Sequence, residues 1–145
     1  MARELAHSRL IASAAREVLA PLGLHRRGRS RTWFDDRVWW LGVVAFQPSG
    51  FSRGSYLNVG ATWLWGGKDY VSYDAGGRVG HAPFVSYEND EQFAPEARRL
   101  AGIAAAEVAE LRAAFPTVSA AADYLFANAH INGWPRFNAA IAAPH

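Results

Sequence analysis

The chain has 145 residues, half of them hydrophobic, and a formal charge of only +2, so it suits one compact domain over residues 1–145 and gives only a weak electrostatic signal for nucleic acid. It contains no cysteine, which excludes disulfides, thiolate nucleophiles and cysteine zinc sites. Charged residues interrupt the N-terminal stretch and no apolar window is long enough to cross a bilayer, so we expect a small soluble, cytoplasmic protein without membrane contact.

The chain begins with an amphipathic pattern that predicts a helix over residues 2–20. Its apolar residues recur at the i, i+3, i+4 and i+7 spacing of one helical face. Pro21 and Gly23 are expected to end the helix, because proline disfavours helical geometry in the residue before it and glycine lets the backbone turn. Residues 25–31, HRRGRSR, follow as the densest charge run. They suit a solvated connector or, alternatively, a contact for a phosphate or carboxylate group.

Residues 32–65 hold five of the six tryptophans and predict the centre of an antiparallel sheet. Strands are expected at residues 30–34, 37–47 and 55–65, with Asp35-Asp36 as a tight turn between the first two. A further hairpin is predicted from its alternation, with strands near residues 70–73 and 79–87 and a turn at residues 74–77. The sheet is therefore a meander of about five strands between residues 30 and 87.

Symmetric connections between these strands would place Trp33 opposite Val38, Trp39 opposite Trp63, and Gly42 opposite Gly60. The face expected to receive the helices is almost wholly apolar and holds Trp39, Leu41, Val43, Ala45, Leu57, Val59, Ala61 and Trp63. The other face is mixed and holds Arg31, Trp33, Val38, Trp40, Val44, Phe46, Tyr56, Asn58, Thr62 and Leu64. The facing glycines would leave room there for a packed ring, another backbone or a ligand. A slip of one residue in either loop would exchange partners between the faces.

Two to three helices are predicted after the sheet. Asn89 and Gln92 resemble a capping box, although Pro95 is also well suited to a first helical turn. Thr117 is expected to cap a second helix, and a short third helix is predicted beyond residue 134. The fold class is therefore α+β, an antiparallel sheet packed on one face by an N-terminal helix and two to three C-terminal helices.

Three motifs in the first half of the chain follow one another in a specific order. A helix leads through a Leu-Gly step into basic residues, one strand ends near a glutamine, and the next has the form hydrophobic-Asn-hydrophobic-Gly. The positions are Leu22, Gly23, Leu24, Arg26, Arg27, Phe46, Gln47, Asn58 and Gly60. This half resembles an uncharacterised bacterial family, the domain of unknown function forty-three-oh-four, although Leu24 stands where an aromatic residue is more usual. The resemblance implies the fold but no mechanism, because that family has no established activity.

No arrangement of residues in the sequence forms a catalytic or metal-binding signature. The five histidines lie in separate segments, without the HxxxH or HExxH spacing that sets two ligands on one helical face. Residues 50–54, GFSRG, have the letters of GxSxG but lie in the loop predicted between two strands, without the strand-to-helix turn of a nucleophile elbow, and Gly66-Gly67-Lys68 lacks the spacing of a phosphate loop. We therefore expect no cofactor and no metal, and a protein that is not an enzyme; an enzyme with a non-standard pocket site stays open as an alternative.

The mixed face is the leading candidate for a functional surface. Arg29, Arg31 and Trp33 alternate along the first strand and should point the same way. The candidate binding residues are Arg29, Arg31, Trp33, Trp40, Asn58 and Thr62. Their stacking planes, cationic forks and polar anchors suit a non-enzymatic binding module for a protein partner or an anionic small molecule, with a nucleic-acid-binding domain as the alternative. The competing interpretation is that a hairpin or helix covers the face and its tryptophans fill a second core layer.

Overall fold

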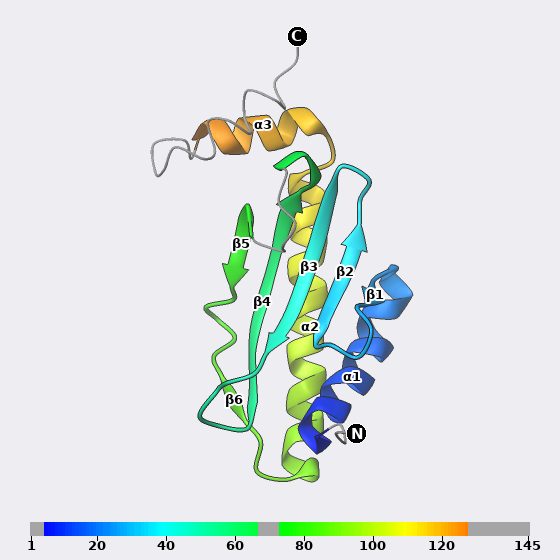
Figure 1. The fold of residues 1–145 in the computed structure, drawn as a ribbon, viewed down its shortest axis with the longest axis vertical. Helices are drawn as coiled ribbons and strands as arrows, with labels where there is room; N and C mark the ends of the chain where they lie inside the picture. The colour runs from blue at the N-terminus through cyan, green and yellow to red at the C-terminus, as the bar shows by residue number, and fades with distance from the viewer. Residues whose placement is uncertain (1–4, 67–72, 128–145) are drawn as a thin grey trace.

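The computed structural model of the protein describes residues 5–66 and 73–127, which form an antiparallel sheet with helices on one face (Figure 1). The predicted α+β class is confirmed, with one helix before the sheet and two after it. In chain order the elements are α1 (Ala6–Leu19), η1 (Ala20–Leu22), β1 (His25–Arg26), β2 (Thr32–Asp36), β3 (Trp40–Gln47), β4 (Gly54–Trp63), η2 (Leu64–Gly66), β5 (Ala75–Arg78), β6 (Val85–Ser86), α2 (Asp90–Ala114) and α3 (Val118–Ala127). The predicted third C-terminal helix and most of the strand predicted at residues 70–73 lie outside the described residues.

The strands follow one another across the sheet as a meander, in the order β1-β2-β3-β4-β5. Each neighbouring pair is antiparallel, and β6 pairs with the first residues of β4, beyond the end of β5. The extra strand β1 comes from the charged run that was expected to be a connector. None of the helices in the described ranges is both long and apolar enough to cross a membrane.

The helix ends follow the local signals in the sequence. A single turn of 3-10 helix containing Pro21 follows α1, and Gly23 then takes a left-handed conformation with φ of 94°. At the start of α2 the side chain of Asn89 accepts a hydrogen bond from the backbone N–H of Gln92 at 2.8 Å. Asn89 therefore caps this helix, and Pro95 lies inside it.

The first hairpin turns later than Asp35-Asp36, where the turn was predicted. β2 continues through Asp36 and the chain reverses at Val38, which has φ of 79° and donates its N–H to Asp36 Oδ1 at 2.9 Å. Asp35 is unavailable for a turn because its buried carboxylate accepts two hydrogen bonds from Arg112 of α2, at 2.8 and 3.0 Å. The pairing moves by an even number of residues, so β2 and β3 keep their predicted relation to one another.

The pairing of β3 with β4 differs from the prediction by one residue. Trp63 lies opposite Trp40 rather than Trp39. The connection between the two strands is one residue longer than predicted, because Gln47 at the end of β3 pairs with Tyr56 and not with Ser55. A shift of one residue exchanges the faces of one strand relative to its neighbour, so the prediction assigned β2 and β3 to the wrong faces and β4 to the correct ones.

The corrected register defines two faces. The helix-covered face lies against α1 and α2 and holds Trp33, Trp40, Val44, Phe46, Leu57, Val59, Ala61 and Trp63. The opposite face, which we call the helix-free face because the described helices do not pack on it, holds Phe34, Leu41, Val43, Ala45, Tyr56, Asn58, Gly60, Thr62 and Arg78 (Figure 1). The predicted core residues of β3 are therefore on the helix-free face, and the predicted mixed-face residues of β2 and β3 are in the core.

β5 occupies positions where a turn was predicted. Residues 75–78 pair with residues 58–61 of β4, and two glycines lie inside the strand. Gly76 has φ of 82°, and a Cβ at this position would overlap the carbonyl oxygen of Val59. The glycines therefore allow β5 to approach β4 closely at the edge of the sheet.

The core divides into two clusters of buried residues. The larger cluster lies between the sheet and the helices α1 and α2. The smaller cluster lies where the sheet meets α3, and its centre is Trp40, Trp63 and Phe115, with Trp39 and Trp65 stacked nearly parallel to Trp63. Most of the tryptophan-rich stretch is therefore a structural cluster at one end of the sheet.

Candidate functional site

The two tryptophans of the predicted site lie in the core. Trp33 and Trp40 are 3% and 2% exposed and belong to the helix-covered face. Their burial follows from the register of β3 and β4, which places both rings under the helices. The prediction that these rings share a surface with Asn58 and Thr62 was wrong, because both rings lie in the core under the helices and not in a second layer on the face of Asn58 and Thr62.

The two predicted arginines separate as well. Arg31 joins three elements on the helix-covered side: it donates from Nη2 to Ser8 Oγ of α1 at 2.9 Å, and from Nη1 to the carbonyls of Gly54 of β4 at 2.9 Å and Phe46 of β3 at 3.4 Å. Arg29 is exposed in the loop between β1 and β2, where its carbonyl accepts a hydrogen bond from Arg26 Nη2 at 2.9 Å. The charge run is therefore partly structural, and it does not form one cationic surface with the tryptophans.

Asn58 and Thr62, the remaining predicted residues, lie on the helix-free face and are 6% and 7% exposed. Asn58 is the centre of a polar network that crosses three strands. Its Nδ2 donates to Gln47 Oε1 at 2.7 Å, and its Oδ1 accepts from Arg78 Nε at 2.9 Å. Arg78 Nη2 closes the ring by donating to the same Gln47 oxygen at 3.0 Å.

Cross-strand pairing brings the members of this network together. Asn58 lies directly opposite Arg78 of β5, and Gln47, the last residue of β3, lies opposite Tyr56. Tyr56 and Asn58 are two residues apart on β4 and so share a face. The Arg78 guanidinium carbon lies 3.9 Å from the centre of the Tyr56 ring, and this ring packs against Phe84 at 4.8 Å. Hydrogen bonds therefore hold the Nε–Nη2 edge of the guanidinium, and the Tyr56 ring covers one of its flat sides.

The charge of Arg78 is not neutralised by these contacts. Both of its acceptors are neutral amide oxygens, and among the described residues no carboxylate pairs with it and no acceptor contacts Nη1. Arg78 is exposed to solvent. The network therefore presents a fixed cation with unused donors at the protein surface.

The gap predicted at the glycines is filled by a tyrosine. Gly60 lies opposite Val43 rather than Gly42, and a Cβ on Gly60 would overlap the ring of Tyr73 and the carbonyl of Ala75. Of the three occupants proposed for the gap, the structure places a packed ring there. Burial raises the pKa of Tyr73, and the positive charge of Arg78 partly opposes this shift. The phenol is therefore a neutral group at pH 7.

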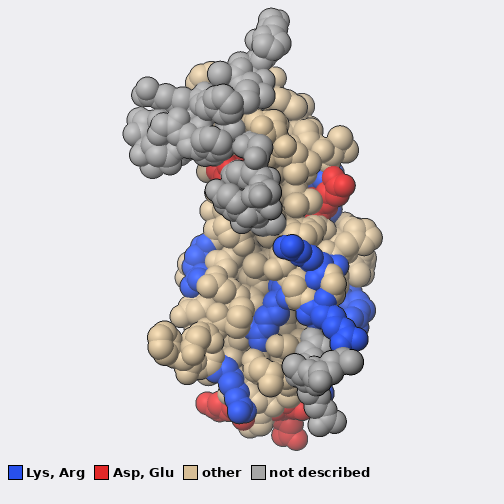
Figure 2. All heavy atoms as spheres, in the orientation of Figure 1, with Lys and Arg blue, Asp and Glu red and all other residues tan. Residues whose placement is uncertain are grey.

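Basic side chains gather on this side of the molecule. Figure 2 shows the helix-free face toward the viewer, with arginine atoms across its middle and acidic atoms only toward its ends. The central part of the described surface therefore favours a negatively charged partner.

Sequence reasoning missed Arg78 and the joint role of Gln47 and Tyr56. Gln47 and Asn58 were recognised as motif positions, but their contact depends on the β3–β4 register. Arg78 lies between the turn predicted at residues 74–77 and the strand predicted from residue 79, so its pairing with Asn58 was not expected. A signal was present, since the glycines before Arg78 are the residues that permit close strand pairing.

The described residues contain no group of three or more histidine or acidic side chains placed to hold a metal ion. No family model matches the chain, and the searches of curated proteins and of solved structures also gave no significant match. The resemblance of the first half to the uncharacterised family therefore stays a prediction.

Proposed function

We propose that the protein is a non-enzymatic binding module whose helix-free face holds a carboxylate of a protein partner against Arg78. The observation that carries the proposal is the guanidinium fixed by Asn58, Gln47 and Tyr56 with no carboxylate partner in the described part of the chain. A side chain fixed before binding loses little conformational freedom when a ligand arrives. Its free donors suit a carboxylate, and a charge-assisted hydrogen bond contributes roughly 1.5–3 kcal/mol.

The shape of this surface favours a protein over a small molecule. Small ligands bind in concave sites that cover most of their surface. Of three cavities in the described residues, of about 330, 220 and 40 Å³, only the second is bordered by this network, through Arg78 at the sheet edge. Arginine and tyrosine are also the residue types that contribute most often to protein interfaces.

An exposed aromatic side chain extends the proposed contact surface. Phe51, in the loop that joins β3 to β4, is 101% exposed, and Gln47 and Tyr56 lie at the base of the same loop. A fully exposed phenylalanine in the loop that starts from Gln47, a hydrogen-bond partner of Arg78, fits the apolar part of a protein interface, and Arg78 fits the charged part. We therefore expect an acidic segment with an apolar neighbour as the partner's contact.

Nucleic acid is the second candidate, and the arginines across the middle of this face favour it. The exposed loop that contains Arg27 and Arg29 would add phosphate contacts at the same end of the sheet. The two candidates differ in which arginines they need. A nucleic-acid surface would use several arginines about equally and would weaken steeply with salt, whereas the proposed site depends on Arg78.

The test compares Arg78→Gln with Arg29→Gln, which removes the same charge from an exposed loop. Binding of a short labelled oligo-glutamate peptide is followed by fluorescence anisotropy, with inorganic phosphate and a single-stranded oligonucleotide as the other two probes. We expect Arg78→Gln to weaken peptide binding about tenfold, or about 1.4 kcal/mol, and Arg29→Gln to have little effect. Equal losses in the two variants, or a preference for the oligonucleotide that falls steeply with salt, would contradict the proposal.

A further inference from the structure

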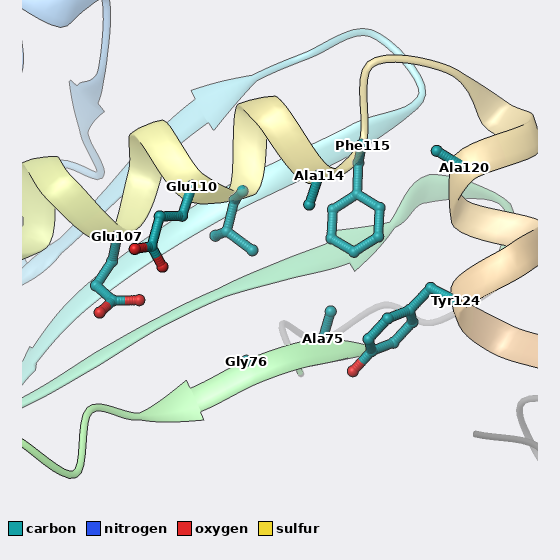
Figure 3. A pocket seen from close by; sticks show the side chains of 9 residues that line it. Ala75, Gly76, Glu107, Glu110, Ala114, Phe115, Ala120 and Tyr124 are labelled. Carbon is teal, nitrogen blue, oxygen red and sulfur yellow. The ribbon is translucent and has the colours of Figure 1, made fainter. Parts of the chain in front are cut away.

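A cavity of about 330 Å³ lies between the C-terminal half of α2, the helix α3 and the edge strand β5 (Figure 3). Its walls are mostly apolar and come from Leu111, Phe115 and the small residues Ala75, Ala114 and Ala120. The space exists because alanines from three different elements face one another there. Its volume is at the lower end of the range of small-molecule sites.

The polar groups of this cavity are two carboxylates and a phenol. Glu107 and Glu110 are three residues apart on α2 and so lie on one side of the helix. Figure 3 shows both carboxylates projecting into the space between α2 and β5, with the Tyr124 ring reaching from α3 toward the strand. The mouth of the cavity is therefore negatively charged.

Little positive charge offsets these two carboxylates. Among the described residues Glu107 forms one ion pair, with His81 at 3.5 Å, and that contact is an ion pair only when the imidazole is protonated; Arg78 borders the adjacent cavity with Glu107 but forms no salt bridge to it. Glu110 forms no ion pair among the described residues and is exposed. A cation that enters the cavity would meet at least one unpaired carboxylate without first breaking a salt bridge.

The aromatic wall is rigid. The Phe115 ring makes edge contacts with Trp63 at 5.0 Å, Tyr124 at 5.4 Å and Trp40 at 6.0 Å between ring centres. Phe115 is thereby fixed between the sheet and α3. Aromatic rings beside carboxylates form favourable surroundings for an organic cation, because the ring face is negative.

We propose that this cavity binds a small organic monocation with an apolar body, such as an arylalkylammonium ion. The charge complementarity of the mouth and the apolar walls select this occupant over a neutral or anionic molecule of the same shape. A bare metal ion does not fit, because the described residues offer no group of three ligands and the walls are apolar. The proposal is independent of the proposed function, since Arg78 and its network do not line this cavity.

The binding test uses three probes of one shape: phenethylammonium, phenethyl alcohol and phenylpropanoate. Each is titrated into the full-length protein labelled with 15N, and the backbone resonances of Leu111 and Ala120 report on the cavity. We expect phenethylammonium to bind several-fold more tightly than the alcohol, and phenylpropanoate to bind least. Equal affinity for the cation and the alcohol, tighter binding of the anion, or no binding of any probe would overturn the proposal.

Four variants localise the binding, and each changes an exposed residue so that folding is preserved. Glu110→Gln is expected to weaken phenethylammonium binding roughly three- to fivefold, whereas Glu91→Gln, the same change in the first turn of α2, leaves it unchanged.

Ala114→Leu fills the cavity and is expected to abolish binding, with Ala113→Leu as its matched control. Unchanged binding in Ala114→Leu would place the ligand elsewhere and contradict the proposal. A dimer of the wild-type protein that Ala114→Leu dissociates would assign the cavity to a second copy of the chain, and would also contradict it.

Discussion

Two arginines on opposite faces of the sheet are held by different kinds of acceptor. On the helix-covered side, Arg112 donates to both carboxylate oxygens of Asp35 at 2.8 and 3.0 Å. On the helix-free face, Arg78 donates to the amide oxygens of Asn58 and Gln47 at 2.9 and 3.0 Å. Arg112 also donates a third hydrogen bond, to the carbonyl of Leu22 at 2.7 Å, and of the two side chains only Arg112 is neutralised.

The difference follows from the surroundings of each arginine. Asp35 is buried, and a buried carboxylate needs a nearby cation to offset the loss of water. The hydrogen bond to Asp35 accordingly raises the pKa of Arg112. Arg78 lies at the surface, where water solvates its charge and neutral amides are sufficient to orient it. A guanidinium can thus be held in place without being neutralised, and Arg78 is held in this way.

The largest effect concerns two neighbouring tryptophans, Trp40 and Trp39, of which the β3–β4 register buries only the first completely. Trp40→Ala removes a buried ring from the smaller core cluster and is expected to lower the free energy of unfolding by about 3–5 kcal/mol. Trp39→Ala removes a half-buried ring and is expected to cost less than half of that. Urea unfolding of both variants measures the difference. The reverse order would favour the register in which Trp39, and not Trp40, lies opposite Trp63.

A smaller loss of stability is expected when the carboxylate that binds Arg112 is replaced by an amide, the type of acceptor that binds Arg78. Asp35→Asn replaces the buried carboxylate with an amide and should lower the free energy of unfolding by about 2–3 kcal/mol, because a charge-assisted pair becomes an uncompensated cation. Glu96→Gln, which breaks the exposed pair with Arg99, is the control and should change stability by less than about 0.5 kcal/mol. Equal unfolding free energies in the two variants would show that the buried pair has no special role.

The smallest effect is a dependence of stability on pH through His7 of α1. Burial lowers the pKa of His7, and the positive charges of Arg31 and Arg53 lower it further. The unfolded chain, with an imidazole pKa near 6.5, therefore binds the proton more readily than the folded protein. As the pH falls below about 6.5, the free energy of unfolding should decrease, by at most about 1.4 kcal/mol per pH unit.

His7→Phe is expected to remove this part of the pH dependence, because the new ring can still pack against Tyr87 and Phe93. Urea unfolding of both proteins across this pH range isolates the contribution of His7 from that of the other titrating groups. The account of His7 is wrong if the two slopes agree, or if acid stabilises the wild-type protein more than the variant.

The parts of the fold that depend on local chemistry could be predicted from the sequence. Pro21 with Gly23 and Asn89 with Gln92 act within a few residues of their own positions, so the helix ends were readable. The β3–β4 register was not, because it depends on where pairing begins after the loop, and a loop one residue longer exchanges the two faces. The Asp35-Asp36 pair is typical of a turn, but Asp35 lies inside β2, where it accepts a hydrogen bond from Arg112 of α2.

The candidate site was predictable only in part for the same reason. Asn58 and Thr62 were assigned to a functional face, and both lie on the helix-free face. Trp33 and Trp40 were grouped with them because the loop between β3 and β4 was assumed to be one residue shorter than it is. Arg78 enters the site through strand pairing across a segment that the sequence marks as a turn. Contacts between residues of different strands depend on the pairing register, so they could be identified only from the structure.

The most direct test of the central claim compares Arg78 with Arg112 in one protein sample. The side-chain Nε–H resonances of both arginines are recorded by NMR while the oligo-glutamate peptide is added. Because Arg78 has free donors and Arg112 already contacts a carboxylate, we predict that the Arg78 resonance shifts in a saturable way and that the Arg112 resonance does not move. An Arg78 resonance that stays in place, or equal shifts at every exposed arginine, would contradict the claim that this face holds a fixed binding site for a carboxylate.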